Sequence, residues 1–163
     1  MESRPASTFV ISLTPFAADG SLDEEGLRAH LCRLLASGIG VYVGGSGSGE
    51  GYVRSAPERR RVLEIASEVL SEQVPVRAMG VEPRSAREMI AYAEQVAAAG
   101  LDAMQVYSLD QGHGYRPRPE ELDGYLWRCS MRCRFRLFSR RTRRWATTSR
   151  PSWCRSSSKR IHT

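Results

Sequence analysis

Lysine is almost absent from this sequence: its 163 residues contain one, Lys159. Catalysis through a Schiff base needs a lysine amine of lowered pKa, desolvated in a pocket. Lys159 stands in the segment SSSKRIHT next to Arg160, on no recognisable strand. We therefore expect no Schiff-base amine and no other catalytic lysine in this chain.

Acidic residues are absent from residues 127–163, which we call the basic tail. The basic tail contains eleven arginines and Lys159, a formal charge of +12, together with all three tryptophans and three of the four cysteines. Residues 1–126 contain twelve arginines and all eighteen acidic residues, a formal charge of −6. The net charge of +6 therefore describes neither part, and the sequence predicts two domains, 1–126 and 127–163.

Long apolar runs are also absent. No stretch of about 18 apolar residues exists, so the sequence predicts no membrane span and no membrane partner. The first residues, MESRPASTFVISLTPF, lack the unbroken apolar core of a signal peptide. Residues 1–126 hold one cysteine, Cys32, which we expect to be a small buried core residue in a reducing compartment. These absences predict a cytoplasmic protein.

Strand and helix patterns alternate through residues 1–126, about every 30 residues. Apolar strand patterns occupy 9–13, 40–45, 76–79 and 102–107. Helix starts are predicted where a serine and a glutamate have capping-box spacing: Ser21 and Glu24, Ser55 and Glu58, Ser85 and Glu88. Gly38 and Gly100 are predicted to end the first and third helices. A fourth helix, EELDGYL, is predicted to begin at Pro119 and to meet the boundary at residue 126.

Alternating strands and helices are typical of an α/β fold with a parallel sheet and right-handed crossovers. Four such units fit either a small open doubly wound sheet or the first half of an eightfold barrel, and the pattern does not choose between them. Both architectures place function at the carboxyl ends of the strands. The loops there are 44–55, 80–85 and 107–119.

The loop GGSGSGEGYVRS, residues 44–55, is the most unusual of the three. Its glycines leave backbone N–H groups free to approach an anion. It lacks the third glycine of a dinucleotide fingerprint, the Gly-Lys-Ser/Thr of a phosphate loop, and the flanking glycines of a serine nucleophile elbow. The residues alone leave two interpretations open, an anion-binding loop and a flexible tight turn.

Four separated blocks of residues 8–126 resemble the dihydrodipicolinate synthase / N-acetylneuraminate lyase family. They are SLTPFAADGSLDEEGL, VYVGGSGSGE with RSAPERRRVLEIA, VPVRAMGV with SAREMIAYAEQVAAAGLDAMQV, and YRPRPEELDGYL. The resemblance implies a (β/α)8 TIM barrel, usually tetrameric, that joins or cleaves carbon–carbon bonds through a Schiff base between pyruvate or another 2-keto acid and a strand-6 lysine. It covers about half of a typical member, so the expected fold is the first half of such a barrel, about four βα units.

The resemblance also implies the site residues. The loop after strand 2 holds the keto-acid carboxylate in this family, and aligning it on Gly49 puts Ser48 at the second loop threonine and Gly47 at the first. Gly47, Ser48 and Gly49 are therefore the predicted substrate-binding residues. A tyrosine that members bring from a neighbouring subunit corresponds to Tyr107 or Tyr115. Since the strand-6 lysine has no counterpart, we expect an inactive fragment of a keto-acid lyase or synthase, with no catalytic residue, metal or cofactor.

The basic tail admits three interpretations. Arginines interleaved with tryptophans fit a small α/β protein whose arm binds nucleic acid nonspecifically. A zinc site is disfavoured, because no compact ligand pattern matches Cys129, Cys133, Cys154 and His162. The favoured interpretation is translation out of frame, because arginine, serine, cysteine and tryptophan without acids are what a GC-rich gene then yields.

The tail is also expected to leave the sheet incomplete. With a charge every two or three residues, no strand built from the tail could bury a face, and we expect exposed sheet edges to drive self-association.

Overall fold

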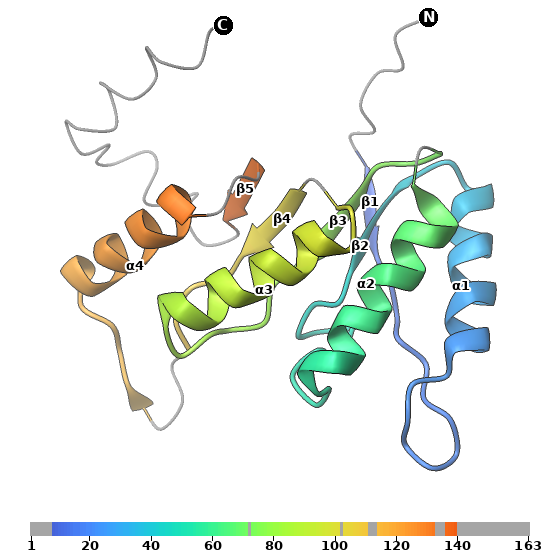
Figure 1. The fold of residues 1–163 in the computed structure, drawn as a ribbon, viewed down its shortest axis with the longest axis horizontal. Helices are drawn as coiled ribbons and strands as arrows, with labels where there is room; N and C mark the ends of the chain where they lie inside the picture. The colour runs from blue at the N-terminus through green and yellow to red at the C-terminus, as the bar shows by residue number, and fades with distance from the viewer. Residues whose placement is uncertain (1–7, 72, 102, 111–113, 133–135, 140–163) are drawn as a thin grey trace, which may run out of the picture.

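The computed structural model describes residues 8–71, 73–101, 103–110 and 114–132, and the backbone of 136–139 (Figure 1). The strands are β1 (Phe9–Ile11), β2 (Gly40–Val43), β3 (Val76–Met79), β4 (Ala103–Val106) and β5 (Arg136–Ser139). The helices are α1 (Glu24–Ala36), α2 (Ala56–Leu70), α3 (Ala86–Ala98) and α4 (Pro119–Arg132). The predicted alternation is therefore confirmed, with β1 and β2 ending two residues and β4 one residue before the ends that the pattern suggested.

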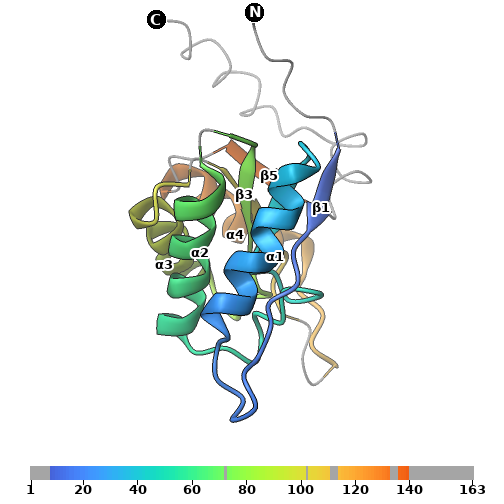
Figure 2. The ribbon, with the colours of Figure 1, turned by 90° about the vertical axis from the view of Figure 1, so that its right-hand side faces the viewer.

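The strands form one parallel sheet in the order β1-β2-β3-β4-β5, so each strand pairs with its neighbours in sequence. Helices α1, α2 and α3 lie side by side over one face of it (Figures 1 and 2). A doubly wound sheet reverses its strand order and has helices on both faces. The sequential order instead matches the first half of a (β/α)8 barrel, which confirms the expected fold class.

The hydrophobic core lies between the sheet and the helices. Alternate strand residues contribute to it, and residues in register across the sheet share a face: Val43 pairs with Ala78, and Ala78 with Met104. The helices supply fully buried side chains from one stripe each, including Leu27, Leu31, Val62, Leu63, Ile65, Met89 and Val96. The core therefore occupies the helix-covered face of the sheet.

The opposite face of the sheet carries an arginine beside two aromatic rings. Tyr42 and Arg77 are in register on β2 and β3. The Arg77 guanidinium carbon lies 4.0 Å from the centroid of the Phe9 ring and 5.9 Å from that of Tyr42. Arg77 Nη1 also donates to the Tyr42 hydroxyl at 3.2 Å. This face is therefore polar and aromatic where the helix-covered face is aliphatic.

The predicted helix caps differ in outcome. At α2, Ser55 Oγ accepts the Glu58 N–H and the Glu58 carboxylate accepts the Ser55 N–H, the capping box as predicted. At α3, Ser85 Oγ accepts the Glu88 N–H at 3.3 Å, but the Glu88 carboxylate accepts from the Arg84 N–H instead. The third box is therefore half formed.

The first predicted cap, Ser21, is wrong. The N-cap of α1 is Asp23, whose carboxylate accepts the Gly26 N–H at 2.9 Å. Ser21 instead donates its N–H and hydroxyl to Asp19 in the turn before the helix. An aspartate directly before the first helical turn is at least as good an N-cap as serine, and its charge also favours the helix start.

Cys32 is exposed, which corrects its predicted burial. The buried stripe of α1 contains Leu27 and Leu31. Cys32 follows Leu31 by one residue, about 100° further round the helix, and so leaves the face that packs on the sheet.

Helix α4 crosses the predicted domain boundary: it continues past Leu126 to Arg132. Strand β5 then pairs in parallel with β4, from Arg136 beside Ala103 to Ser139 beside Val106. Part of the basic tail thus continues the βα pattern in its backbone, which the sequence did not indicate. The side chains of β5 and residues 140–163 lie outside the described residues, so the predictions on burial and nucleic-acid binding by the tail remain predictions. In the described part of the chain no helix has the length and apolarity to cross a membrane.

Candidate functional site at the carboxyl ends of the strands

The parallel sheet brings the loops after β2, β3 and β4 to one end of the molecule (Figure 1). We call residues 44–55, which link β2 to α2, the glycine loop. The loop is folded back on itself: Gly51 N–H donates to the Gly45 carbonyl and Glu50 N–H to the Gly47 carbonyl, both at 2.8 Å. Glu50 has a positive φ of 48°, a conformation uncommon outside glycine.

Gly49 is required by this folding. A Cβ atom at Gly49 would lie 2.8 Å from both the nitrogen and the oxygen of Gly45, closer than side chains approach backbone. A Cβ at Gly47 would meet no atom within 4 Å. The loop therefore needs its glycines unequally, and position 47 has room for a side chain.

The predicted binding residues lie on the turn of this loop. Gly47 and Ser48 are exposed and Gly49 is buried. Among the described residues, no hydrogen bond is made by the backbone N–H groups of residues 46–49. Adjacent unpaired N–H groups at a turn can donate hydrogen bonds to an anion. Carboxylate binding is thus chemically available at Gly47, Ser48 and Gly49.

One contact ties the glycine loop to the next strand. The Ser46 hydroxyl donates to the carboxylate of Glu82, which follows β3. The two residues are 36 positions apart in the sequence, so no local pattern could reveal this contact.

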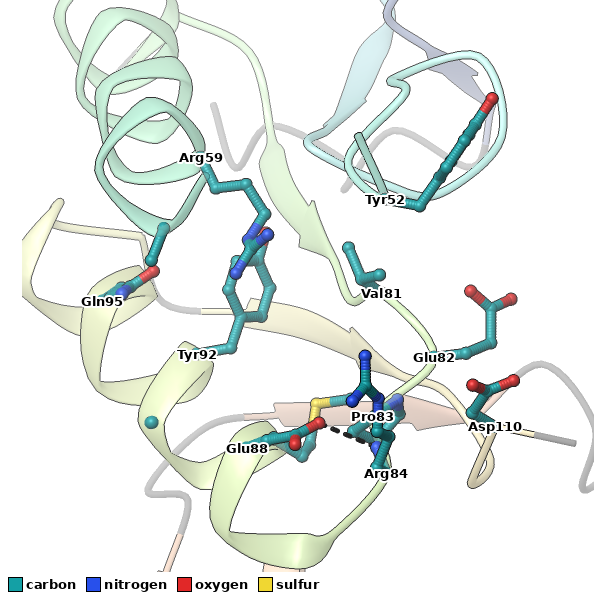
Figure 3. Close-up of a pocket in the computed structure, with 13 residues that line it drawn as sticks. Tyr52, Arg59, Val81, Glu82, Pro83, Arg84, Glu88, Tyr92, Gln95 and Asp110 are labelled. Carbon is teal, nitrogen blue, oxygen red and sulfur yellow. Dashed lines mark hydrogen bonds between the residues drawn. The ribbon is translucent and has the colours of Figure 1, made fainter. Parts of the chain in front are cut away.

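A pocket of about 520 Å³ lies beside the glycine loop, between the starts of α2 and α3 (Figure 3). Tyr92 is one of its lining residues; its hydroxyl donates to the Met79 carbonyl at 2.9 Å, and burial raises the pKa of Tyr92. Gly47, Ser48 and Gly49 are not among its lining residues, which are Tyr52, Ala56, Arg59, Val81, Glu82, Pro83, Arg84, Glu88, Met89, Ala91, Tyr92, Gln95 and Asp110. The predicted site and the pocket are therefore separate but adjacent. The hydrogen bond between Ser46, next to Gly47, and Glu82, which lines the pocket, connects them.

Arg54, at the far end of the glycine loop, is 4% exposed. Its Nη2 donates to the carbonyls of Thr14 and Pro15 at 3.2 and 3.3 Å, in the loop after β1. Burial lowers the pKa of the guanidinium, and the charges of Glu58 and Glu50 oppose that shift. A buried arginine in a loop has no signature in sequence, and our sequence reasoning missed it.

The two tyrosines that the resemblance indicated have different surroundings. Tyr107 packs against the hydrophobic core, and its carbonyl accepts from the Tyr125 hydroxyl at 2.6 Å. Tyr115 is 48% exposed, and its hydroxyl donates to Glu121 at 2.9 Å. Neither tyrosine is among the residues that line the pocket.

No group of three or more histidine, cysteine or acidic side chains in the described ranges is arranged to hold a metal ion. Of the cysteines and histidine considered as a zinc set, Cys129 is a residue of α4 and is buried in the core. Cys133, Cys154 and His162 lie outside the described residues.

Known proteins share this sequence pattern. The model of the dihydrodipicolinate synthetase family matches residues 4–111. The 4-hydroxy-tetrahydrodipicolinate synthase of Methanopyrus kandleri is 37% identical over 98 residues, which are 58% of this chain and 33% of that protein. The N-acetylneuraminate lyase of an Enterobacter species, strain 638, is 49% identical over 57 residues, 34% of this chain and 19% of that protein.

A solved structure gives the same picture. YagE, a prophage protein of the dihydrodipicolinic acid synthase family from E. coli K12 in complex with pyruvate, superposes with a TM-score of 0.70 at 26% identity. The superposition covers 80% of this chain and 43% of YagE. This chain thus spans less than half the length of the relatives it matches, and within that span it belongs to the dihydrodipicolinate synthetase family.

Proposed function

We propose that this chain binds the carboxylate of a small 2-keto acid, such as pyruvate, at Gly47, Ser48 and Gly49, and that alone it does not catalyse carbon–carbon bond chemistry. The Ser48 hydroxyl and the N–H groups of the turn would donate to the carboxylate. The chain would then be a keto-acid-binding fragment of a lyase or synthase, with no metal or cofactor required.

The observation that carries the proposal is the row of N–H groups at residues 46–49, unpaired within the described part of the chain. Fixed backbone donors that need no reorganisation favour an anion over water. The complex of the related YagE with pyruvate supports a 2-keto acid as the ligand class.

The absence of catalysis is argued from chemistry. A Schiff base requires a lysine amine in the pocket. Residues 1–126 contain no lysine, and Lys159 lies in the basic tail. Binding without the amine leaves the keto group unactivated, so we expect ligand binding and no turnover.

An NMR titration tests the binding. We expect pyruvate to shift the amide signals of residues 46–50, and pyruvamide, which lacks the carboxylate charge, to shift them far less. Ser48→Ala should weaken binding by about fivefold through loss of one hydrogen bond. Ser130→Ala, on α4, is the matched control. Pyruvate shifts confined to other residues would refute the proposed site.

Borohydride trapping tests the absence of Schiff-base chemistry. The chain is incubated with pyruvate and borohydride, digested and weighed by mass spectrometry. We expect no stoichiometric adduct on a lysine side chain. A full adduct mapped to Lys159 would show that the amine does reach the keto acid and that the chain is not inactive.

A further inference from the structure

The guanidinium of Arg54 joins the glycine loop to the loop after β1. It donates to two consecutive carbonyls there, those of Thr14 and Pro15, 40 and 39 positions away in the sequence. Its carbon also lies 4.1 Å from the centroid of the Phe16 ring, the next residue. Three consecutive residues of one loop are thus held by a single side chain of the other.

Burying this charge is unfavourable unless a structural gain offsets it. Arg54 is 4% exposed, and its Nε and Nη1 have no hydrogen-bond partner among the described residues. Burial of a charged group with unused donors costs free energy. An apolar side chain would fill the same space without that cost, so the contacts of Nη2 and the ring must account for an arginine here.

The backbone of Arg54 connects to the turn that carries Ser48. The Arg54 carbonyl accepts Nη1 of Arg59 at 2.5 Å, and the same nitrogen lies 3.4 Å from the Gly51 carbonyl. The Gly51 N–H in turn donates to the Gly45 carbonyl. The contacts therefore run without a break from the β1 loop to both ends of the turn at residues 46–50.

We infer that Arg54 is a positioning residue for the keto-acid carboxylate: it fastens the glycine loop to the β1 loop and so holds the N–H groups of residues 46–49 in the orientation that receives the anion. This inference rests on the proposed function. Arginine is suited to the task because a planar guanidinium can donate to two carbonyls and stack on a ring at once. A lysine can supply the charge and one such contact.

Hydrogen-exchange NMR on the full chain separates positioning from general stability. The variants are Arg54→Met, Arg54→Lys and the matched control Arg60→Met, which removes an exposed arginine that pairs with Glu64 on its own helix. The probes are the N–H groups of Glu50 and Gly51, both hydrogen-bonded within the loop, and that of Leu63 inside α2.

In Arg54→Met we expect the Glu50 and Gly51 N–H groups to exchange about tenfold faster, with Leu63 unchanged, because the hydrogen bonds of the guanidinium are local and charge-assisted. Arg54→Lys should lie between Arg54→Met and the wild type, and Arg60→Met should match the wild type. Pyruvate affinity should fall about fivefold in Arg54→Met relative to Arg60→Met.

Exchange at Glu50 and Gly51 that equals the Arg60→Met value would overturn the inference, and so would acceleration of Leu63 by the same factor. If the wild type binds pyruvate and Arg54→Met binds it equally tightly, the role of Arg54 is refuted but the proposed function is not. If the wild type itself does not bind pyruvate, the proposed function is refuted, and with it the assignment of Arg54 to a carboxylate site. If Arg54→Met does not fold, Arg54→Lys against Arg60→Lys makes the same comparison.

Discussion

Position 47 shows how much one side chain can matter in the glycine loop. The resemblance aligns Gly47 with a threonine, and a Cβ there would meet open space. We predict that Gly47→Ser adds a second hydroxyl beside Ser48 and tightens pyruvate binding by about fivefold, the effect of one added hydrogen bond. The measurement is the dissociation constant from the NMR titration, with no loss of stability in urea.

The matched variant is Gly49→Ala. Its Cβ would lie 2.8 Å from the backbone of Gly45, so the turn must open. We expect weaker pyruvate binding and a lower urea midpoint. Equal effects of the two variants would mean that the loop does not hold the folded-back geometry on which the site depends.

The sequence indicates part of this site and not the rest. The run of glycines and the two serines between them, Ser46 and Ser48, identify the turn at 46–50 without a structure. Arg54 and Glu82 could not be found in that way, since their partners lie 40 and 36 residues away. Contacts of that separation depend on which strands become neighbours, and a single sequence does not contain that information directly.

Helix α2 provides a test at the scale of an element, because both halves of its capping box are formed. We predict that Ser55→Ala lowers the free energy of unfolding by about 1 kcal/mol, the usual cost of losing a serine N-cap. Ser85→Ala should cost less, because the Ser55 hydroxyl also donates to the Glu58 carboxylate at 2.6 Å, whereas among the described residues Ser85 makes only the bond from the Glu88 N–H. Urea unfolding of both variants measures the difference, and a larger loss at Ser85 would contradict it.

The contribution of Glu58, the other half of the α2 capping box, should depend on pH. Hydrogen bonds from the Ser55 hydroxyl and N–H lower the pKa of the Glu58 carboxyl from its ordinary value. A carboxyl with a lowered pKa stabilises the fold above its ordinary pKa, and that stability is lost as the pH falls through the folded value. Glu58→Gln should therefore be destabilised near neutral pH and match the wild type once Glu58 is protonated. A difference that persists in acid would exclude this cause.

The predicted ends of helices α1 and α4 differ in how well they match the structure, for local reasons. Gly38 ends α1 with a φ of +65°, as predicted from a glycine at the end of the helical pattern. Ser21 failed as a cap because Asp23 stands closer to the first turn, and two acceptors within three residues cannot be ranked from spacing alone. The end of α4 is predicted at residue 126, after which acidic residues are absent. Residues 127–132 lack acidic residues but remain helical, so the helix extends to Arg132.

Among the described residues β1 is an edge strand of the sheet and pairs with β2 alone. The Ser12 N–H donates to the Tyr42 carbonyl and the Thr8 carbonyl accepts from Gly40, so the N–H of Ile11, between them, points away from β2. Unpaired strand edges associate with other strands. We predict concentration-dependent self-association in sedimentation velocity, abolished by Ile11→Pro, which removes that N–H and leaves the β1–β2 bonds intact.

Ile11→Ala is the control for that experiment. It loses the same apolar side chain as Ile11→Pro but retains the N–H, so it should associate as the wild type does. Equal association of all three proteins would place the contact elsewhere than the β1 edge. Loss of association in both variants would assign it to the side chain of Ile11.

The order β1-β2-β3-β4-β5 has a consequence for how the chain is made. Each described strand after β1 pairs with the strand synthesised just before it, so each of these pairings closes over one helix and its loops. A nascent chain can therefore add one βα unit at a time as it leaves the ribosome. At each stage the strand synthesised last is the edge of the sheet, and the next strand to be synthesised pairs with it.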